Sequence, residues 1–452
     1  MGEGTYHPNE NQVLPVPDPT KPYWRSELHD LDDFRSTPNL PSECDIVIIG
    51  GGMAGVTTAY HLLLENDTPP NIVLLEARQL CSGATGRNGG HCKTKVQTLV
   101  NLLPTHGPDG IDKLVNYVQG VQYGIKEIVE REDLDCEFEL RRSFDVSITS
   151  RKENKDTYDE ACKDGSGWTK QTWFINNRLA EMTTSVTGAK SAFSVPACSF
   201  WPYKFVTQLL QKTLNRYPNA LNLQTRTPVT SVTQADGDVT NFVKTPRSTI
   251  KCSKVIFATN AYTSGLLPSF TDIIIPYKGM ASHITPKSIV HPHLSNTYNI
   301  DFGPDKDVDY LNPRPDGGIV VGGGKWNYAS DRDSWYNNID DSTLFPPKAL
   351  KHWDGYMQRN FRGWEDSEAK VESVWVGIQA LTTDGFPHVG RVPGKRGQYM
   401  LAGFNGSGMA MILTNAKAVA KMMREEREFE DVAQEFAIPE WFGTSLERMT
   451  TA

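Results

Sequence analysis

The sequence predicts an α/β protein in which both ends of the chain form one domain and the middle is inserted as another. Near the start, from residue 45, apolar strand-like runs alternate with helical patterns, an order typical of parallel sheets. Strand-like runs separated by turns fill 272–325, which indicates antiparallel strands. Residues 399–425 again have the pattern of a strand, a glycine turn and a helix. We therefore expect the last segment to rejoin the first.

The composition is that of an ordinary globular protein. The 452 residues suffice for two or three domains, with 38% hydrophobic and 22% charged residues and a net charge of −8. No basic block predicts nucleic-acid binding, no apolar run reaches the ~20 residues of a membrane span, and no secretory signal opens the chain. Seven scattered cysteines without a Cys-x-x-Cys pair predict neither a metal site nor a disulfide framework. We expect a cytoplasmic protein.

Several elements are predicted along the chain. Residues 1–42 are rich in proline and poor in periodicity, which favours an extended N-terminal arm laid over the surface. Periodicity predicts helices at about 109–131, 205–214, 346–362 and 411–425. The predicted strands include 143–148, 220–224, 227–232, 254–261, 272–276, 279–284, 318–324 and 371–378.

The stretch 44–76 carries the most specific motif. An apolar run leads into Gly50-x-Gly52-Met53-Ala54-Gly55, then an apolar helix, a second apolar run and Glu76. The three glycines allow a tight turn, a close approach of pyrophosphate, and close packing of helix on strand. Glu76 follows the last glycine by 21 residues (76 − 55), where an acid can accept from ribose hydroxyls. This predicts a dinucleotide site for FAD or NAD rather than NADP; a chance glycine turn is the alternative.

Three further motifs narrow the prediction. Residues 82–91 read Ser-Gly-Ala-Thr-Gly-Arg-Asn-Gly-Gly-His, a loop whose backbone amides can follow a ligand. Residues 258–261 read Ala-Thr-Asn-Ala, and Trp375-x-Gly377 precedes two glycine turns at 383–390 and 403–408. Taken together and in this order, the motifs resemble the FAD-dependent D-amino-acid-oxidase-like family, in particular its γ-glutamylputrescine oxidase and glycine or sarcosine oxidase branch. The leader around Tyr23-Trp24 also resembles fungal members of that branch.

The resemblance implies an α/β, bilobal fold, with a Rossmann-like FAD-binding domain and an inserted, mixed, largely antiparallel substrate domain. Under this interpretation the arm spans 1–42, the FAD-binding domain 43–140, 199–270 and 373–430, the substrate domain 141–198 and 271–372, and a C-terminal tail 431–452.

Carried over by position, the resemblance also implies the residues that bind FAD. The glycine turn would hold the pyrophosphate, the acid and its neighbours the adenosine, the glycine-rich loop the phosphates and flavin, and the later motifs the adenine and the flavin ring. The residues are Gly50, Gly52, Met53, Ala54, Gly55, Glu76, Ala77, Arg78, Ser82, Thr85, Gly86, Arg87, Asn88, Gly89, Gly90, Val229, Thr259, Asp384, Gly406, Ser407 and Gly408.

The implied reaction is oxidation of a C–N bond of an amine or amino acid to an imine, by hydride transfer to flavin N5, with O2 reduced to H2O2. The candidate catalytic residues are Lys278, Lys325, Tyr310 and His91. Other candidates for the site are His388 and Trp326, and Arg142 or Arg314 for a substrate carboxylate. The alternatives are a dehydrogenase with another electron acceptor and a noncatalytic FAD-binding regulatory subunit. The oligomeric state and the particular substrate stay open.

The predicted FAD is noncovalent. Residues 374–380 contain no cysteine where some sarcosine oxidases attach their flavin, and Arg87 stands near the position where related dehydrogenases use histidine. His91 and Cys92 lie nearby and are the alternative attachment points.

Overall fold

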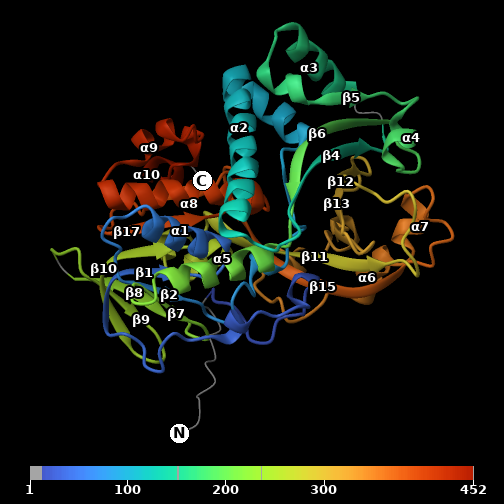
Figure 1. Ribbon diagram of the computed structural model, residues 1–452. Helices are drawn as coiled ribbons and strands as arrows, with labels where there is room; N and C mark the ends of the chain where they lie inside the picture. The colour runs from blue at the N-terminus through green and yellow to red at the C-terminus, as the bar shows by residue number, and fades with distance from the viewer. Residues whose placement is uncertain (1–12, 150–151, 236, 451–452) are drawn as a thin grey trace.

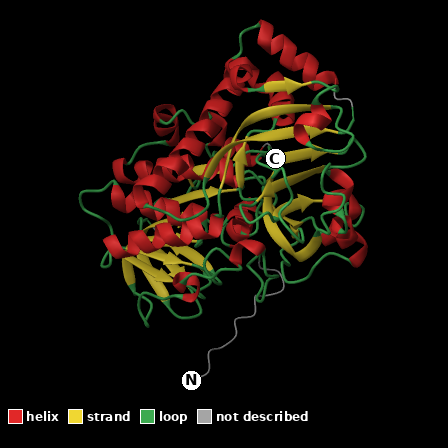
Figure 2. Ribbon diagram, turned by 45° about the vertical axis from the view of Figure 1, so that its right-hand side comes forward, coloured by secondary structure: helices red, strands yellow, loops and turns green. Residues whose placement is uncertain are grey.

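The computed structural model describes residues 13–149, 152–235 and 237–450 (Figure 1). The strands form two sheets, an eight-stranded sheet A and a nine-stranded sheet B. Figure 2 shows the strands gathered in these two groups, with helices packed around them. The α/β prediction, with one largely parallel and one largely antiparallel part, is therefore confirmed.

Sheet A contains the strands from both ends of the chain. Its order is β16 (His388–Arg391), β17 (Gln398–Ala402), β10 (Thr249–Phe257), β1 (Glu43–Ile49), β2 (Ile72–Leu75) and β7 (Leu221–Gln224), with β9 (Asn241–Lys244) and β8 (Ser231–Gln234) as a side branch. The strands from β17 to β7 run parallel, whereas β16 and β9 are antiparallel to their neighbours.

Both faces of sheet A are buried. Ile46 and Ile48 pack into the same cluster as the helices, while Val47 and Ile49 pack on the opposite face against residues of β9 and β10. A strand covered on both sides reads as a continuous apolar run, which is why 46–49 shows no alternation. The covering helices are α1 (Met53–Leu64), α5 (Pro202–Arg216), α8 (Gly408–Glu425) and the long α2 (Val96–Glu132).

Sheet B has the order β15 (Lys370–Thr382), β11 (Ile274–Thr285), β14 (Ile319–Gly323), β13 (Val308–Pro313), β12 (Thr297–Asp301), β4 (Glu139–Ser147), β6 (Ser191–Ser199) and β3 (His91–Lys93), with β5 (Trp173–Ile175) beside β6. Apart from the parallel pair of β12 and β4, its neighbours are antiparallel. The smaller helices are α3 (Lys152–Lys163), α4 (Ala180–Thr184), α6 (Pro347–Leu350), α7 (Tyr356–Asn360), α9 (Phe429–Glu435) and α10 (Leu446–Thr450). Strands β4, β6 and β15 span expected domain boundaries, and β3 of sheet B lies within the 43–140 segment.

Several predicted elements differ in detail. The strands expected at 272–276 and 279–284 are one strand, β11, because Tyr277 and Lys278 continue the pairing with β15. The helix expected at 346–362 is broken into α6, a short 3₁₀ turn and α7, with Gly355 at φ +61° before α7. Helix α2 changes direction at Gly107, whose φ of +65° is not helical.

In the part that the structure describes, the N-terminal arm is mostly exposed or half-buried and is anchored by a few buried side chains. Leu14, Trp24 and Leu31 are almost completely buried. Their apolar side chains pack inside the protein, and the arm is held by short 3₁₀ turns at Tyr23–Arg25 and Asp30–Asp33. Residues 1–12 lie outside the described residues.

No helix in the described part of the chain is both long enough and apolar enough to cross a bilayer.

Candidate functional site

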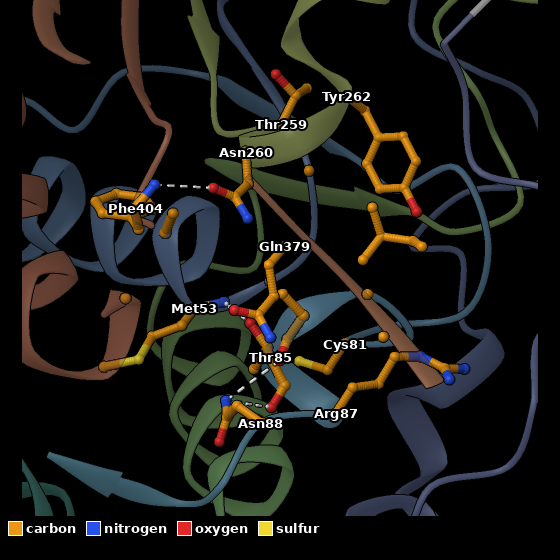
Figure 3. A pocket seen from close by; sticks show the side chains of 18 of the residues that line it. Met53, Cys81, Thr85, Arg87, Asn88, Thr259, Asn260, Tyr262, Gln379 and Phe404 are labelled. Atoms are coloured by element: carbon orange, nitrogen blue, oxygen red, sulfur yellow. Dashed lines mark hydrogen bonds between the residues drawn. The ribbon is translucent and has the colours of Figure 1, made fainter. Parts of the chain in front are cut away.

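A cavity of about 250 Å³ is lined by elements of both sheets. From sheet A come the turn between β1 and α1, the end of β2 and the segment after β10. From sheet B come β11, β13 and β15, and the start of α8 completes the wall. Figure 3 shows side chains from these separate segments converging on it.

The glycine turn at the start of α1 is shaped as the motif requires. Gly50 has a φ of +116°, and a Cβ on it would lie 2.5 Å from the carbonyl oxygen of Ala258. A Cβ on Gly55 would lie 1.9 Å from the carbonyl oxygen of Gly50, so the helix can approach the strand only with glycine there. The N-cap residue Gly52 has no side chain to cap the first turn of α1, and the first-turn amides that no side chain binds are available to a phosphate.

Glu76 and Thr85 fix this turn. The Glu76 carboxylate accepts from the backbone N–H groups of Gly51 (2.8 Å) and Arg78 (2.9 Å). The Thr85 hydroxyl accepts from the N–H of Met53 at 2.9 Å, so the glycine-rich loop closes against the start of α1 (Figure 3). Both side chains line the cavity. These contacts join the glycine turn at 50–55 to the glycine-rich loop at 82–91.

Two buried arginines brace the glycine-rich loop. Arg78 forms a two-point ion pair with Asp341, at 2.8 and 3.0 Å. The Nε of Arg87 donates to the carbonyl of Ser82 at 2.7 Å, and another of its N–H groups donates to that of Val376 at 2.6 Å. Burial lowers the pKa of Arg87 to about 10, so it stays charged at neutral pH.

The sheet B side of the cavity carries His91 and Tyr310. Their rings lie 5.8 Å apart, edge to face, and a Cβ on Gly89 would lie 2.8 Å from the Tyr310 ring. Burial lowers the pKa of His91 well below its usual value, and its Nδ1 has no hydrogen-bond partner among the described residues. Burial likewise raises the pKa of Tyr310. Both side chains are therefore neutral at physiological pH.

Comparison with known proteins identifies the family. Residues 45–422 match the family described as FAD dependent oxidoreductase (DAO). The chain belongs to this family of FAD-dependent oxidoreductases. It is similar to gamma-glutamylputrescine oxidoreductase of Escherichia coli (strain K12), with 21% identity over 438 residues that cover 90% of each chain. It is also similar to glycine oxidase of Bacillus subtilis (strain 168), with 21% identity over 406 residues, 87% of this chain and 96% of that one.

Solved structures agree on the fold. L-proline dehydrogenase from P. horikoshii superimposes with a TM-score of 0.68 at 20% identity, over 88% of this chain and 98% of that one. The predicted family, its branch and FAD as cofactor are confirmed by these matches. The resemblance of the leader to fungal members stays a prediction.

The residues present fit FAD. The glycine turn leaves room and free amides for a pyrophosphate, and Glu76 follows β2 as the ribose-binding acid should. Of the predicted binding residues, those that line the cavity are Gly50, Gly52, Met53, Ala54, Glu76, Ala77, Arg78, Thr85, Arg87, Asn88, Gly89, Val229, Thr259, Gly406 and Gly408. Their individual roles toward FAD stay predictions.

Five predicted binding residues do not line the cavity but support its wall. Gly55 packs α1 on β1, and Ser82 is buried as an acceptor for the two arginines. A Cβ on Gly86 would lie 2.3 Å from the carbonyl of Cys81, and one on Gly90 2.5 Å from the Trp24 ring. Ser407 is the N-cap residue of α8.

Asp384 lies apart from the cavity. Its carboxylate binds the guanidinium of Arg448 at 2.7 and 3.1 Å. Burial alone would raise its pKa, but this ion pair outweighs burial and lowers it. No sequence motif points to that partner, which lies 64 residues away.

Of the four candidate catalytic residues, only His91 and Tyr310 line the cavity. Lys278 alternates with Gly279 along β11 and so points to the other face, where its Nζ lies 3.8 Å from Asp340. The Nζ of Lys325 lies 4.5 Å from the centre of the Trp335 ring. Neither lysine is placed to act on a ligand in the cavity.

The other candidates also lie elsewhere. Arg142 donates to the hydroxyl of Ser194 at 2.7 Å, and Arg314 is buried in an ion pair with Glu137. His388 is buried, with its Nδ1 3.0 Å from the hydroxyl of Thr444, and Trp326 packs on His352. Cys92 is buried but does not line the cavity.

Some cavity residues were missed. Asn260 accepts from the N–H groups of Gly403 and Phe404, both at 3.2 Å, and so links two of the motifs (Figure 3). Asn260 stands inside the 258–261 motif and could have been singled out there. The hydroxyl of Tyr262 is buried without a hydrogen-bond partner among the described residues. Phe404 stands inside the 403–408 motif, whereas nothing in the sequence signals Leu14, Pro15, Gln379 and Met409.

Proposed function

We propose that the protein oxidises the C–N bond of a small amine or amino acid to an imine, with O2 as the final electron acceptor and H2O2 as product. When bound, FAD accepts the hydride from the carbon next to the nitrogen. The observation that carries the proposal is that one cavity is lined both by the glycine turn of β1 and α1 and by the sheet B residues His91, Tyr310 and Gln379. A cofactor and a small substrate can therefore share it. The relatives named for oxidation of γ-glutamylputrescine and glycine support the substrate class.

The neutral state of His91 and Tyr310 suits this chemistry. An amine gives up hydride only when its nitrogen lone pair is free, so the site must hold it unprotonated. Neutral His91 places no positive charge beside the amine, and the Tyr310 hydroxyl can donate a hydrogen bond to the substrate. We assign to these two residues the orientation of the substrate amine in its neutral form.

The charges around the cavity favour an amine over a substrate with a free α-carboxylate. Among the described residues that line it, the only arginines are Arg78 and Arg87, and both are engaged by Asp341, Ser82 and backbone carbonyls. Arg142 and Arg314 lie elsewhere. A carboxylate in the cavity would therefore lack the arginine fork that usually binds it.

Two further expectations belong to the proposal. FAD is held noncovalently, so acid denaturation should release it into the supernatant. Flavin that stays in the protein pellet would indicate covalent attachment, and His91 would be the first residue to mutate.

A cytoplasmic location is supported by the seven cysteines, all of which are free.

The test is a panel of amines, N-alkyl amino acids and amino acids, assayed in parallel for H2O2 formation in air and for reduction of an artificial dye acceptor under nitrogen. We expect H2O2 with at least one amine. Dye reduction without H2O2 would replace the oxidase with a dehydrogenase. If no compound produced H2O2 or reduced the dye, the noncatalytic regulatory subunit would be the better interpretation.

A further inference from the structure

Residues 13–25, here called the strap, lie before the segment 45–422 that matches the family. The strap crosses residues 78–90, which include most of the glycine-rich loop. It contacts them at several points, although more than 50 residues separate the two segments in the sequence. In Figure 1 the dark-blue start of the described chain passes along the lower side of the molecule, across the junction of the two sheets. Nothing in the family match assigns it a role.

The first part of the strap forms a wall of the cavity. Leu14 is 4% exposed, and both Leu14 and Pro15 line the cavity. The preceding carbonyl of Val13 packs so closely on the 3₁₀ turn Asn260–Gly265 that a Cβ on Gly265 would lie 2.1 Å from its oxygen. A ligand in the cavity is therefore bounded on this side by the strap.

The middle of the strap binds both bracing arginines. Arg78 donates to the carbonyl of Val16 at 2.9 Å. Arg87 donates to the carbonyl of Thr20 at 2.6 Å and to its hydroxyl at 3.0 Å. The N–H of Thr20 in turn donates to the carbonyl of Asp341 at 2.8 Å. Buried guanidinium groups need such partners, so the strap and the loop stabilise each other.

The last part of the strap is anchored by Trp24. Its indole N–H donates to the carbonyl of Asn88 at 2.5 Å, and its own carbonyl accepts from the indole of Trp201 at 2.6 Å. The Trp24 side chain is fully buried. Displacing the strap would expose this ring and break both bonds.

We propose that the strap is a cofactor-retaining element: Leu14 and Pro15 close the cavity that holds FAD, while Thr20 and Trp24 fasten the strap to the loop around it. Release of FAD then requires the strap to come away, and FAD binding and strap docking stabilise each other. The proposal depends on FAD binding and not on the amine substrate, so failure of the proposed reaction would leave it standing.

The first test compares FAD release from three variants of the holoenzyme. Leu14→Ala removes the wall and Thr20→Val removes the hydroxyl that accepts from Arg87, while Lys21→Ala changes the exposed neighbour of Thr20. After dilution, release is followed by the rise in fluorescence of free FAD. We expect release about tenfold faster from the first two variants and a wild-type rate from the control, since such changes act mainly on dissociation. Release from both variants within about twofold of wild type would overturn the proposal.

The second test uses the wild-type protein and does not depend on a variant that folds. Trypsin cleavage after Arg25 is compared between the holoenzyme and protein stripped of FAD. We expect faster cleavage without FAD, and restoration of protection when FAD is added back. Equal rates in the two forms would contradict the coupling of strap and cofactor.

Discussion

The guanidinium of Arg78 and the carboxylate of Asp341 form a two-point ion pair at 2.8 and 3.0 Å, with both side chains buried. Asp341 also lies 3.5 Å from the Nε of Arg87. Arg78 follows β2 of sheet A, whereas Asp341 lies between β14 and β15 of sheet B. The pair thus joins the cofactor loop to the chain that forms the opposite wall of the cavity.

Asp341→Asn should destabilise the protein by about 3–5 kcal/mol, because it leaves a buried arginine pair without its counter-charge. Denaturant unfolding of FAD-free protein measures this loss. Asp333→Asn is the matched control, since Asp333 is exposed, and this change should cost less than about 1 kcal/mol. Equal effects of the two changes would mean that the buried pair does not stabilise the fold.

Gly55→Ala should abolish FAD binding. The added methyl group would lie 1.9 Å from the carbonyl of Gly50, so α1 must move away from β1 and the phosphate-binding turn opens. The ratio of flavin to protein after purification measures the effect. Gly120→Ala serves as control: it is exposed on α2, nothing lies within 4 Å of its Cβ position, and alanine there should stabilise by about 0.5–1 kcal/mol. Full flavin content in Gly55→Ala would refute the assignment of the turn.

Tyr310→Phe should lower the rate of flavin reduction by the best substrate about tenfold or more, with unchanged FAD content, because Tyr310 lines the cavity and its hydroxyl is proposed to orient the substrate. Lys278→Met and Lys325→Met should change that rate by less than about threefold, since neither lysine lines the cavity. Rapid mixing without oxygen measures all three. A larger loss in a lysine variant than in Tyr310→Phe would restore the lysines as catalytic candidates.

Stability should fall on acidification below about pH 6.5. Burial lowers the pKa of His388 to about 3, so the unfolded chain takes up this proton near pH 6.5 while the folded protein resists it. The contribution is complete above pH 6.5 and declines toward pH 3, by about 1.4 kcal/mol per pH unit. His61 and His91 act in the same direction. His388→Gln should therefore reduce the slope of unfolding free energy against pH without removing it; an unchanged slope would show that His388 is protonated in the folded state.

The sequence predicted best what is local. The turn at Gly50–Gly55 and Glu76 lies within a single strand–helix–strand unit, whose spacing alone fixes the geometry. The direction of Lys278 could not be read from the sequence in the same way, because neighbouring residues of a strand face opposite sides and only the sheet shows that Gly279 lines the cavity.

Contacts between distant segments could not be predicted. The resemblance placed Arg78 beside adenosine, and nothing in the sequence points to its buried partner Asp341, which is 263 residues away. Residues 13–25 have no periodicity, and their burial depends on partners from 78–90, 260–265 and 341. The proline-rich composition suggests a surface segment but does not show which of its side chains are buried anchors.

Anaerobic mixing of the purified, FAD-loaded protein with amines tests the proposed reaction most directly. An amine substrate should bleach the flavin absorbance band completely, with one equivalent of imine formed per flavin, and at a rate that Tyr310→Phe lowers. Flavin that stays oxidised with every amine and amino acid, although it is bound in full amount, would contradict the proposed reaction.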